Sequence, residues 1–384
     1  MTGKTIAVLG GGIGGFLAAR RLRKELPSRD RVLLIERDRE HAFQPSLPFV
    51  LSGRRDPAAI ERPVAGIAKL GVDVVQADVT AIDISSQTVL AGGEKHDYDY
   101  LVIALGAQLD PEAMPGFEES AINVFTPDGA AIARDELRTL KGGRVAVVVS
   151  RLPYKCPAAP YEFAFIADAL LRKTDARSRT SVDVYTPEPL PMPTTGPAIG
   201  HAVASMLAAR KIGFHPNTQL QRIDPANRRL KFEDGSDAEY DLILGIPPHR
   251  APDAVSSCDL AGPTGFVPVD KATLETTADG VYAIGDVASI GLADGKFLPK
   301  AGVFAHSQAD VVASRIADEL AGRSPSRVFD GSGSCFLELG NGKAGYAKGN
   351  FYGESGPEVR MRREGYHWHI GKVAFEEYWL RFRW

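Results

Sequence analysis

The stretch TIAVLGGGIGGFLAARRLRKEL, residues 5–26, determines the fold of this chain. Its first five residues are apolar or β-branched, as in a buried parallel strand, and residues 16–26 have the composition of a helix. Between them, Gly10, Gly12 and Gly15 have the spacing G-x-G-x-x-G. The first glycine allows a tight turn, the second lets the backbone approach a pyrophosphate, and the third lets the helix pack on the strand. We therefore predict a dinucleotide-binding unit here.

A second strand and an acid follow at the expected distance. Residues 31–35 form the next predicted strand, and Glu36 comes directly after it, 21 residues beyond Gly15. In such a unit a carboxylate at this position binds a ribose hydroxyl, and the pyrophosphate rests on the helix N-terminus. Strand, glycines, helix, strand and acid in register are far more specific than the glycines alone.

Two later segments predict the rest of the same nucleotide site. Residues 98–107 and residues 280–286 each read as a strand running into a small-residue turn, the second ending in Gly285-Asp286. This ending resembles the second FAD signature of the glutathione-reductase-like flavoproteins, which have two dinucleotide-binding domains. The resemblance implies an α/β fold class with two Rossmann-like domains and a small C-terminal α+β region. The expected limits are 1–108 with 265–320 for the FAD-binding domain, 109–264 for the second domain, and 321–384 for a C-terminal interface or acceptor-site region.

The second Rossmann-like unit departs from a nucleotide site. Residues 144–149 form its predicted first strand, but no glycine occurs between Gly143 and Gly196. Instead LPYKCP, residues 152–157, brings prolines and bulky side chains to the place where a pyrophosphate needs open backbone. The next predicted strand, residues 182–187, ends without an acid. We infer that the fold is kept while nicotinamide binding is lost.

Two of the three cysteines lie in segments of unusual composition. Cys156 and Cys335 are each placed in a predicted Gly- or Pro-rich turn, whereas Cys258 has the context of an ordinary thiol. Cys156 precedes a predicted helix, residues 160–173, and follows Lys155; a helix N-terminus and a lysine both lower a thiol's pKa. One interpretation is that Cys156 and Cys335 have a redox role. The other is that each is simply a small buried residue in a loop.

Composition and length exclude several classes of protein. The 384 residues suffice for two or three domains, and the net charge of -3, without a basic block or zinc-finger spacing, argues against nucleic-acid binding. Neither a signal peptide nor a spanning segment of about 18 apolar residues is predicted. His367 and His369 alternate on a predicted strand without a third ligand, so no metal site is expected.

The aromatic and basic C-terminal residues, 375–384, have two interpretations. They form either a small interfacial anchor on a membrane or a helix packed on the domain or on a partner in a homo-oligomer. We expect a cytoplasmic or peripherally membrane-associated protein.

Four segments make the chain similar to the sulfide:quinone oxidoreductase and flavocytochrome c sulfide dehydrogenase family. They are FQPSLP (43–48), CPAAPYE (156–162), LPKAG (298–302) and GSCFLE (333–338), and the similarity extends over nearly the whole chain. It implies that Cys156 and Cys335 form a redox pair, as a disulfide or bridged by polysulfide, that oxidises sulfide or small sulfur species to polysulfide or sulfur. Electrons then pass through FAD to a quinone. Glu162 is a candidate general base, although an acid early in a helix also suits the helix dipole.

The resemblance also assigns the cofactor and acceptor sites. Lys300 is implied to lie beside the flavin pyrimidine, where a cation stabilises the anionic reduced flavin. No cysteine occurs in residues 43–51 or directly before Thr126-Pro127, where relatives attach flavin or carry a third active-site cysteine, so non-covalent FAD is expected. The implied quinone contacts are Phe336, Phe375 and Tyr378. The implied FAD contacts are Gly10, Gly12, Ile13, Gly14, Gly15, Glu36, Arg37, Gln44, Pro45, Val79, Ala104, Gly106, Gly285, Asp286, Lys300 and Gly302.

Three alternative functions remain open at this point. One is a flavin subunit that delivers electrons from sulfide to a cytochrome c partner. Another is an NAD(P)H-linked flavoprotein dehydrogenase, which would need the missing second set of glycines. The last is a redox-inactive FAD scaffold or sensor.

Overall fold

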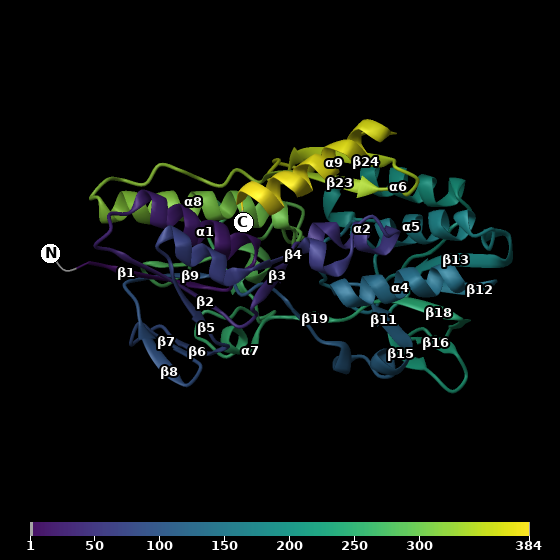
Figure 1. The fold of residues 1–384 in the computed structure, drawn as a ribbon, viewed down its shortest axis with the longest axis horizontal. Helices are drawn as coiled ribbons and strands as arrows, with labels where there is room; N and C mark the ends of the chain where they lie inside the picture. Colours follow the sequence, from purple (N-terminus) through teal and green to yellow (C-terminus); the bar gives the residue numbers. More distant parts are fainter. Residues whose placement is uncertain (1–2, 384) are drawn as a thin grey trace.

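The structure is a computed structural model that describes residues 3–383. Two parallel sheets lie side by side along the long axis, and the C-terminal segment lies across both (Figure 1). The chain begins in the first sheet, builds the second, and then returns to the first before it ends. Within residues 3–383, no helix combines the length and hydropathy that crossing a bilayer requires.

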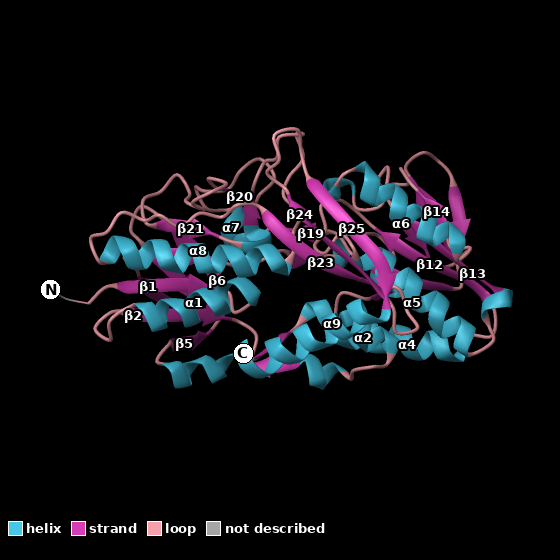
Figure 2. Ribbon diagram, turned by 90° about the horizontal axis from the view of Figure 1, so that it is seen from above, coloured by secondary structure: helices cyan, strands magenta, loops and turns pink. Residues whose placement is uncertain are grey.

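The first sheet is built around the glycine-rich stretch. Its strands are all parallel, and α1 (Ile13–Glu25) packs beside α8 (Gly302–Leu320) on one face (Figure 2). The late strand β21 completes the sheet at its edge, so the segment after residue 280 does return to the first unit. The strands, in spatial order, are β21 (Val281–Ala283), β9 (Tyr100–Ile103), β1 (Thr5–Leu9), β2 (Arg31–Glu36) and β5 (Asp73–Gln76).

Strand β1 shows why this sheet is apolar on both faces. Ile6 and Val8 contact the core under α1 and α8, whereas Ala7 and Leu9 belong to a core on the opposite face. Alternate side chains of a strand point to opposite faces, and both faces are covered here. The opposite cover comes from β6 (Val79–Asp83), β7 (Thr88–Ala91), β8 (Glu94–Asp97) and α7 (Asp253–Ser256).

Helix α1 begins at Ile13, three residues before the predicted start at Phe16. Gly14 and Gly15 take part in its first turn, although glycine is unfavourable inside a helix. Glycine is kept at these positions because a side chain would collide with neighbouring atoms: a Cβ at Gly15 would lie 1.9 Å from the Gly10 oxygen, and one at Gly14 would lie 3.3 Å from an Ile284 methyl group.

The second sheet repeats the parallel pattern. Val145, Val147 and Val149 of β12 (Gly143–Val149) pack under the helices, and Ala146 and Val148 pack on the other face. The spatial order is β11 (Ala121–Asn123), β18 (Leu242–Ile246), β12, β13 (Thr180–Tyr185) and β14 (Gly213–His215). The helices are α2 (Leu47–Ser52), α4 (Pro127–Thr139), α5 (Ala159–Lys173) and α6 (Pro197–Ala209). The other face carries α3 (Phe117–Ser120), β15 (Leu220–Asp224), β16 (Arg229–Phe232) and β17 (Asp237–Glu239).

Short strand pairs complete the connections between these layers. They are β3 (Glu40–Ala42) with β4 (Glu61–Pro63), β10 (Gln108–Leu109) with β19 (His249–Arg250), and β20 (Val267–Pro268) with β22 (Ala288–Ser289). The mixed α/β architecture agrees with the fold class predicted from the sequence, while the predicted limits of the three regions stay a proposal.

The C-terminal segment corrects two local predictions. It forms an antiparallel sheet of β23 (Ser332–Glu338), β24 (Ala344–Asn350) and β25 (Glu358–Gly365), followed by α9 (Tyr366–Tyr378) and a π-helical turn, Trp379–Arg383. Cys335 therefore lies inside a strand, because pairing with β24 overrides the turn-like composition around it. His367 and His369 lie on α9 and not on a strand. The strand prediction was wrong because two alternating positions are too few to distinguish a strand from a helix.

Candidate active site

A cavity of about 710 Å³ lies where the two sheets meet the C-terminal segment. Its volume is within the range of about 300–1,000 Å³ typical of ligand and cofactor sites. The strands of the first sheet lead into it at their C-terminal ends, where Rossmann-like units bind nucleotides. Its wall also includes residues of α5, β23 and α9.

The glycine loop has the geometry that a pyrophosphate site requires. Gly10 has φ +98°, and a Cβ there would lie 2.4 Å from the Ala104 carbonyl oxygen. A Cβ at Gly15 would lie 1.9 Å from the Gly10 oxygen, so this glycine lets helix and strand pack closely. A Cβ at Gly12 would meet nothing within 4 Å, and Gly12 lines the cavity. Gly10 thus allows the tight turn, Gly12 leaves the backbone open to a pyrophosphate, and Gly15 allows the helix to pack closely on the strand, as such a site needs.

Glu36 lies at the end of β2 and faces the same cavity. Its Oε2 accepts a hydrogen bond from the Gly11 backbone N–H, and its Oε1 accepts one from Asp38 N at 2.8 Å. The acid therefore lies beside the glycine loop at the end of the second strand, which is the position from which a Rossmann-like unit binds a ribose hydroxyl.

The other residues expected to contact FAD divide into two groups. Gly15 lies behind the loop and does not line the cavity. The remaining predicted contacts line it: Gly10, Gly12, Ile13, Gly14, Glu36, Arg37, Gln44, Pro45, Val79, Ala104, Gly106, Gly285, Asp286, Lys300 and Gly302. Open backbone, an acid beside it and a deep cavity fit a dinucleotide cofactor.

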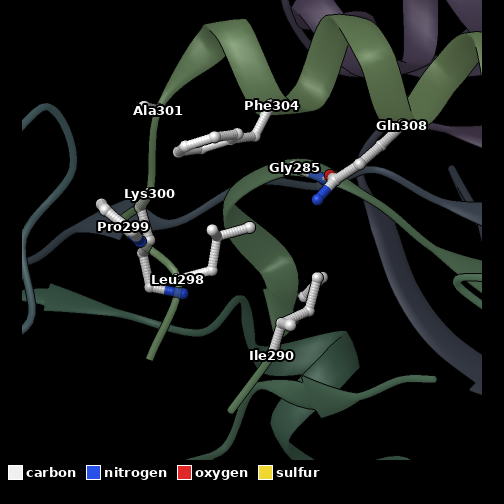
Figure 3. A pocket seen from close by; sticks show the side chains of 9 residues that line it. Gly285, Ile290, Leu298, Pro299, Lys300, Ala301, Phe304 and Gln308 are labelled. Atoms are coloured by element: carbon white, nitrogen blue, oxygen red, sulfur yellow. The ribbon is translucent and has the colours of Figure 1, made fainter. Parts of the chain in front are cut away.

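The Gly285 turn is fixed against α8. The buried Gln308 side chain accepts a hydrogen bond from Gly285 N at 2.7 Å, and Figure 3 shows this side chain reaching the turn below Phe304. Lys300 Nζ donates to the Asp286 carbonyl oxygen at 2.5 Å and lies 3.4 Å from the centroid of the Phe266 ring. Burial lowers the pKa of Lys300 to about 8, and the charge of Asp286 opposes this shift.

Cys156 and Cys335 line this same cavity although 179 positions separate them in sequence. Cys156 is in the loop before α5, and its backbone N–H donates to the Lys300 oxygen at 2.7 Å. Cys335 comes from β23 and is exposed toward the open cavity. Both are free thiols in the structure, so the disulfide form stays a prediction. Cys258 is buried in the core of the first unit, away from them.

The thiol pKa values contradict the expectation drawn from Lys155 and the helix N-terminus. Burial raises the pKa of Cys156 well above its ordinary value, and the negative charge of Glu162 adds to the effect. The same two causes raise the pKa of Cys335 to about 12. Lys372 opposes both shifts without reversing them. Loss of hydration thus outweighs the favourable helix end.

A buried charge network lies beside the two cysteines. Glu162 Oε1 accepts hydrogen bonds from Lys372 Nζ and from the Glu338 backbone N–H, both at 2.8 Å. Glu338 Oε2 in turn pairs with His369 Nδ1 at 2.9 Å. Burial opposes the charge on Lys372, but the combined effect of Glu162 and Glu338 raises its pKa. Burial also raises the pKa of Glu338, opposed by Lys372 and His369.

The network joins α5, β23 and α9 and shows what sequence reasoning missed. Glu162 was predicted, but Lys372, which also lines the cavity, was not. The sequence signal for Lys372 is a single lysine within an otherwise apolar helical face. Its partner Glu162 is 210 positions away, so no local motif connects the two.

Two of the three predicted quinone contacts line the cavity. Phe336 and Phe375 do so, whereas Tyr378 does not and is 46% exposed. Lys372 and Phe375 of α9 and Trp379, the first residue of the π-helical turn, lie on the same inner face at helical spacing, which turns Tyr378 outward. The missed residue is Trp379, which lines the cavity and stacks on Phe43 with ring centroids 5.3 Å apart.

The chain belongs to the pyridine nucleotide-disulphide oxidoreductase family, whose model matches residues 4–309. This is a family of FAD-binding flavoproteins, so the expected cofactor class is confirmed.

Individual relatives are named for sulfide and quinone. The chain is 26% identical to the sulfide-quinone reductase of Aquifex aeolicus, over 98% of this chain and 90% of that protein. It is 25% identical to the mitochondrial sulfide:quinone oxidoreductase of Dictyostelium discoideum, over 99% of this chain and 86% of that protein. The X-ray structure of the Aquifex aeolicus sulfide:quinone oxidoreductase superposes with a TM-score of 0.87 at 25% identity, covering 98% of this chain and 90% of that one. The family resemblance predicted from the sequence is thereby confirmed.

Proposed function

We propose that this protein is an FAD-dependent sulfide oxidoreductase in which Cys156 and Cys335 receive electrons from sulfide and a quinone finally accepts them. The observation that carries the proposal is the placement of both cysteines in the wall of the cavity that holds the glycine loop. Relatives named sulfide:quinone oxidoreductase, similar over nearly the whole chain, support the same substrate and acceptor.

The proposed reaction begins with the cysteines joined as a disulfide. Hydrosulfide attacks one sulfur, so that one new S–S bond forms and the Cys156–Cys335 bond breaks. The products are a persulfide on one cysteine and a thiolate on the other, and the two electrons released from sulfide now reside on that thiolate. Bound FAD would accept this pair as the thiolate sulfur bonds to the outer sulfur of the persulfide, which loses its proton, so that a trisulfide then bridges the two cysteines. The reduced cofactor would in turn supply the pair to the quinone.

The neighbouring charges suit this chemistry. Glu162 lies beside the pair and accepts a proton when hydrogen sulfide enters as the neutral molecule. Because burial raises both thiol pKa values, a released thiolate needs a cation close by, and Lys372 supplies one. Lys300, facing the cavity from the other side, provides the positive charge that an anionic reduced cofactor requires.

The acceptor side is proposed at the inner face of α9. Phe336, Phe375 and Trp379 form an apolar wall suited to a quinone ring. Ile370 on α9 and Phe382 in the π-helical turn after it are exposed, each 65% accessible. Exposed apolar side chains beside Arg381 and Arg383 suit attachment to the surface of a membrane, where quinones reside.

An anaerobic titration tests the proposal. Sulfide is expected to bleach the flavin absorbance of the purified holoprotein within the mixing time, whereas NADH is not, because LPYKCP replaces the second glycine loop. Rapid bleaching by NADH, with no response to sulfide, would favour a pyridine-nucleotide dehydrogenase instead. Turnover with cytochrome c but with no short-chain quinone would place the acceptor in a cytochrome partner.

A further inference from the structure

Glu188 is a buried acid that lies outside the cavity and that the reaction above does not use. It follows β13, which ends at Tyr185, and only 3% of the residue is exposed. In the first unit the matching strand, β2, ends in Glu36, which faces the nucleotide cavity. The acid that seemed missing from the second unit is therefore present, three residues beyond the strand.

The side chain of Glu188 accepts hydrogen bonds from three hydroxyl groups. Its Oε2 accepts hydrogen bonds from Tyr161 at 2.5 Å, from Tyr154 at 2.9 Å and from Thr186 at 3.3 Å. Both tyrosines are buried, and each hydroxyl has a single proton to donate. Burial raises the pKa of Glu188 to about 7, and the hydrogen bonds from Tyr161, Tyr154 and Thr186 oppose the rise.

The two tyrosines bracket Cys156 in the chain. Tyr154 precedes it by two residues, and Tyr161 follows it by five, in the first turn of α5. Cys156 itself has φ +57°, a left-handed conformation that residues with a side chain rarely adopt. Such a conformation persists only where the surroundings hold it. The Lys300 carbonyl oxygen accepts the hydrogen bond of the Cys156 backbone N–H, and Glu188 holds the two tyrosines that flank Cys156 in the chain.

We propose that Glu188 is a positioning residue for Cys156. By joining Tyr154 and Tyr161 on one oxygen atom, it fixes both ends of the cysteine loop and keeps the thiol facing the cavity. Because Glu188 accepts these tyrosine hydrogen bonds, it is not free to bind a ribose hydroxyl in the second unit. The same hydrogen bonds would thus both orient the Cys156 thiol and remove the second nucleotide site. The role rests on the proposed function in taking Cys156 as a redox residue.

Site-specific thiol labelling of the holoprotein, with both cysteines first reduced to thiols, tests this assignment. The rate at which iodoacetamide modifies Cys156 is measured by peptide mass spectrometry relative to Cys335, in Tyr161→Phe, Glu188→Leu and Glu188→Gln. A released loop exposes Cys156 to water and removes the burial that raises its pKa, so labelling accelerates. Loss of one such hydrogen bond shifts the held-to-open equilibrium about fivefold. The labelling ratio is therefore expected to rise about fivefold in Tyr161→Phe and further in Glu188→Leu, while Glu188→Gln, which keeps an oxygen acceptor, stays close to the wild-type value.

Tyr282→Phe is the matched control. It removes the hydroxyl of a buried tyrosine that donates to a carboxylate, Glu319, at 2.7 Å in a part-buried hydrogen bond, and Tyr282 does not line the cavity. Its labelling ratio is expected to equal that of the wild type. An unchanged ratio in Tyr161→Phe and Glu188→Leu, with thermal stability lowered as in the control, overturns the assignment.

Two further results keep the outcomes separate. If Glu188→Leu does not fold, Tyr154→Phe and Tyr161→Phe decide the question, because each removes only one hydroxyl. If sulfide leaves the wild-type flavin unreduced, the proposed function fails, while the labelling ratio still decides whether Glu188 holds the loop.

Discussion

Replacing Lys372 with methionine tests the buried charge network beside the cysteines. The change removes the ammonium that donates to Glu162 at 2.8 Å and keeps most of the side-chain volume. The two side chains are 7% and 3% exposed, so Glu162 would be left as a buried charge with only the Glu338 N–H as a donor. Breaking such a pair costs about 3–5 kcal/mol, and we expect Lys372→Met to lower the free energy of unfolding by that amount.

Guanidinium unfolding of the holoprotein, followed by circular dichroism, measures this cost. The double variant Lys372→Met/Glu162→Gln leaves no charge unpaired, so it is expected to recover about 2 kcal/mol relative to the sum of the single changes. Lys348→Met removes an exposed lysine from the neighbouring strand and is expected to change stability by less than about 0.5 kcal/mol. A cost below about 1 kcal/mol for Lys372→Met, or strictly additive single changes, would refute the reasoning.

Three further predictions concern the cysteines and the cofactor. Cys156→Ser and Cys335→Ser should each abolish sulfide turnover as completely as the double change while FAD stays bound, because the pair acts as one unit; Cys258→Ser should leave turnover unchanged, and residual activity in either of the first two variants would argue against the pair. Glu36→Arg should weaken FAD binding about 10- to 100-fold, the worth of a hydrogen bond to a charged group, measured as flavin retained on dialysis; full occupancy would count against the glycine-loop site. In the reduced holoprotein, alkylation of Cys335 should accelerate about tenfold per pH unit from pH 7 to 9, because its pKa is raised to about 12 and the thiolate fraction grows with pH throughout; a rate that levels off toward pH 9 would show an ordinary thiol.

The fold was predictable where local pattern and tertiary packing agree. The β1–glycine–α1–β2–Glu36 sequence specifies a Rossmann-like unit, because each residue type has a separate steric task there. Cys335 was misplaced because glycine and serine are typical of turns, and only pairing with β24 makes that segment a strand.

Sequence motifs named many of the residues that line the cavity, but not their electrostatics. Sequence motifs named the two cysteines and Glu162, but they did not name Lys372 of α9 or Trp379 of the turn after it, which lie far along the chain. The direction of the pKa shift of Cys156 was predicted wrongly, because burial is a property of the assembled fold and no local motif reports it. Glu188 was missed although it comes directly after the predicted strand, residues 182–187; the observed strand β13 ends earlier, at Tyr185.

The most direct test of the central claim is to find the sulfur on the cysteines. Oxidised holoprotein is mixed anaerobically with less than one equivalent of sulfide, quenched with an alkylating agent within milliseconds, and analysed by peptide mass spectrometry. The account predicts one additional sulfur atom on the peptide of Cys156 or of Cys335, appearing before the flavin absorbance falls. Flavin reduction with no sulfur bound to either cysteine would contradict it.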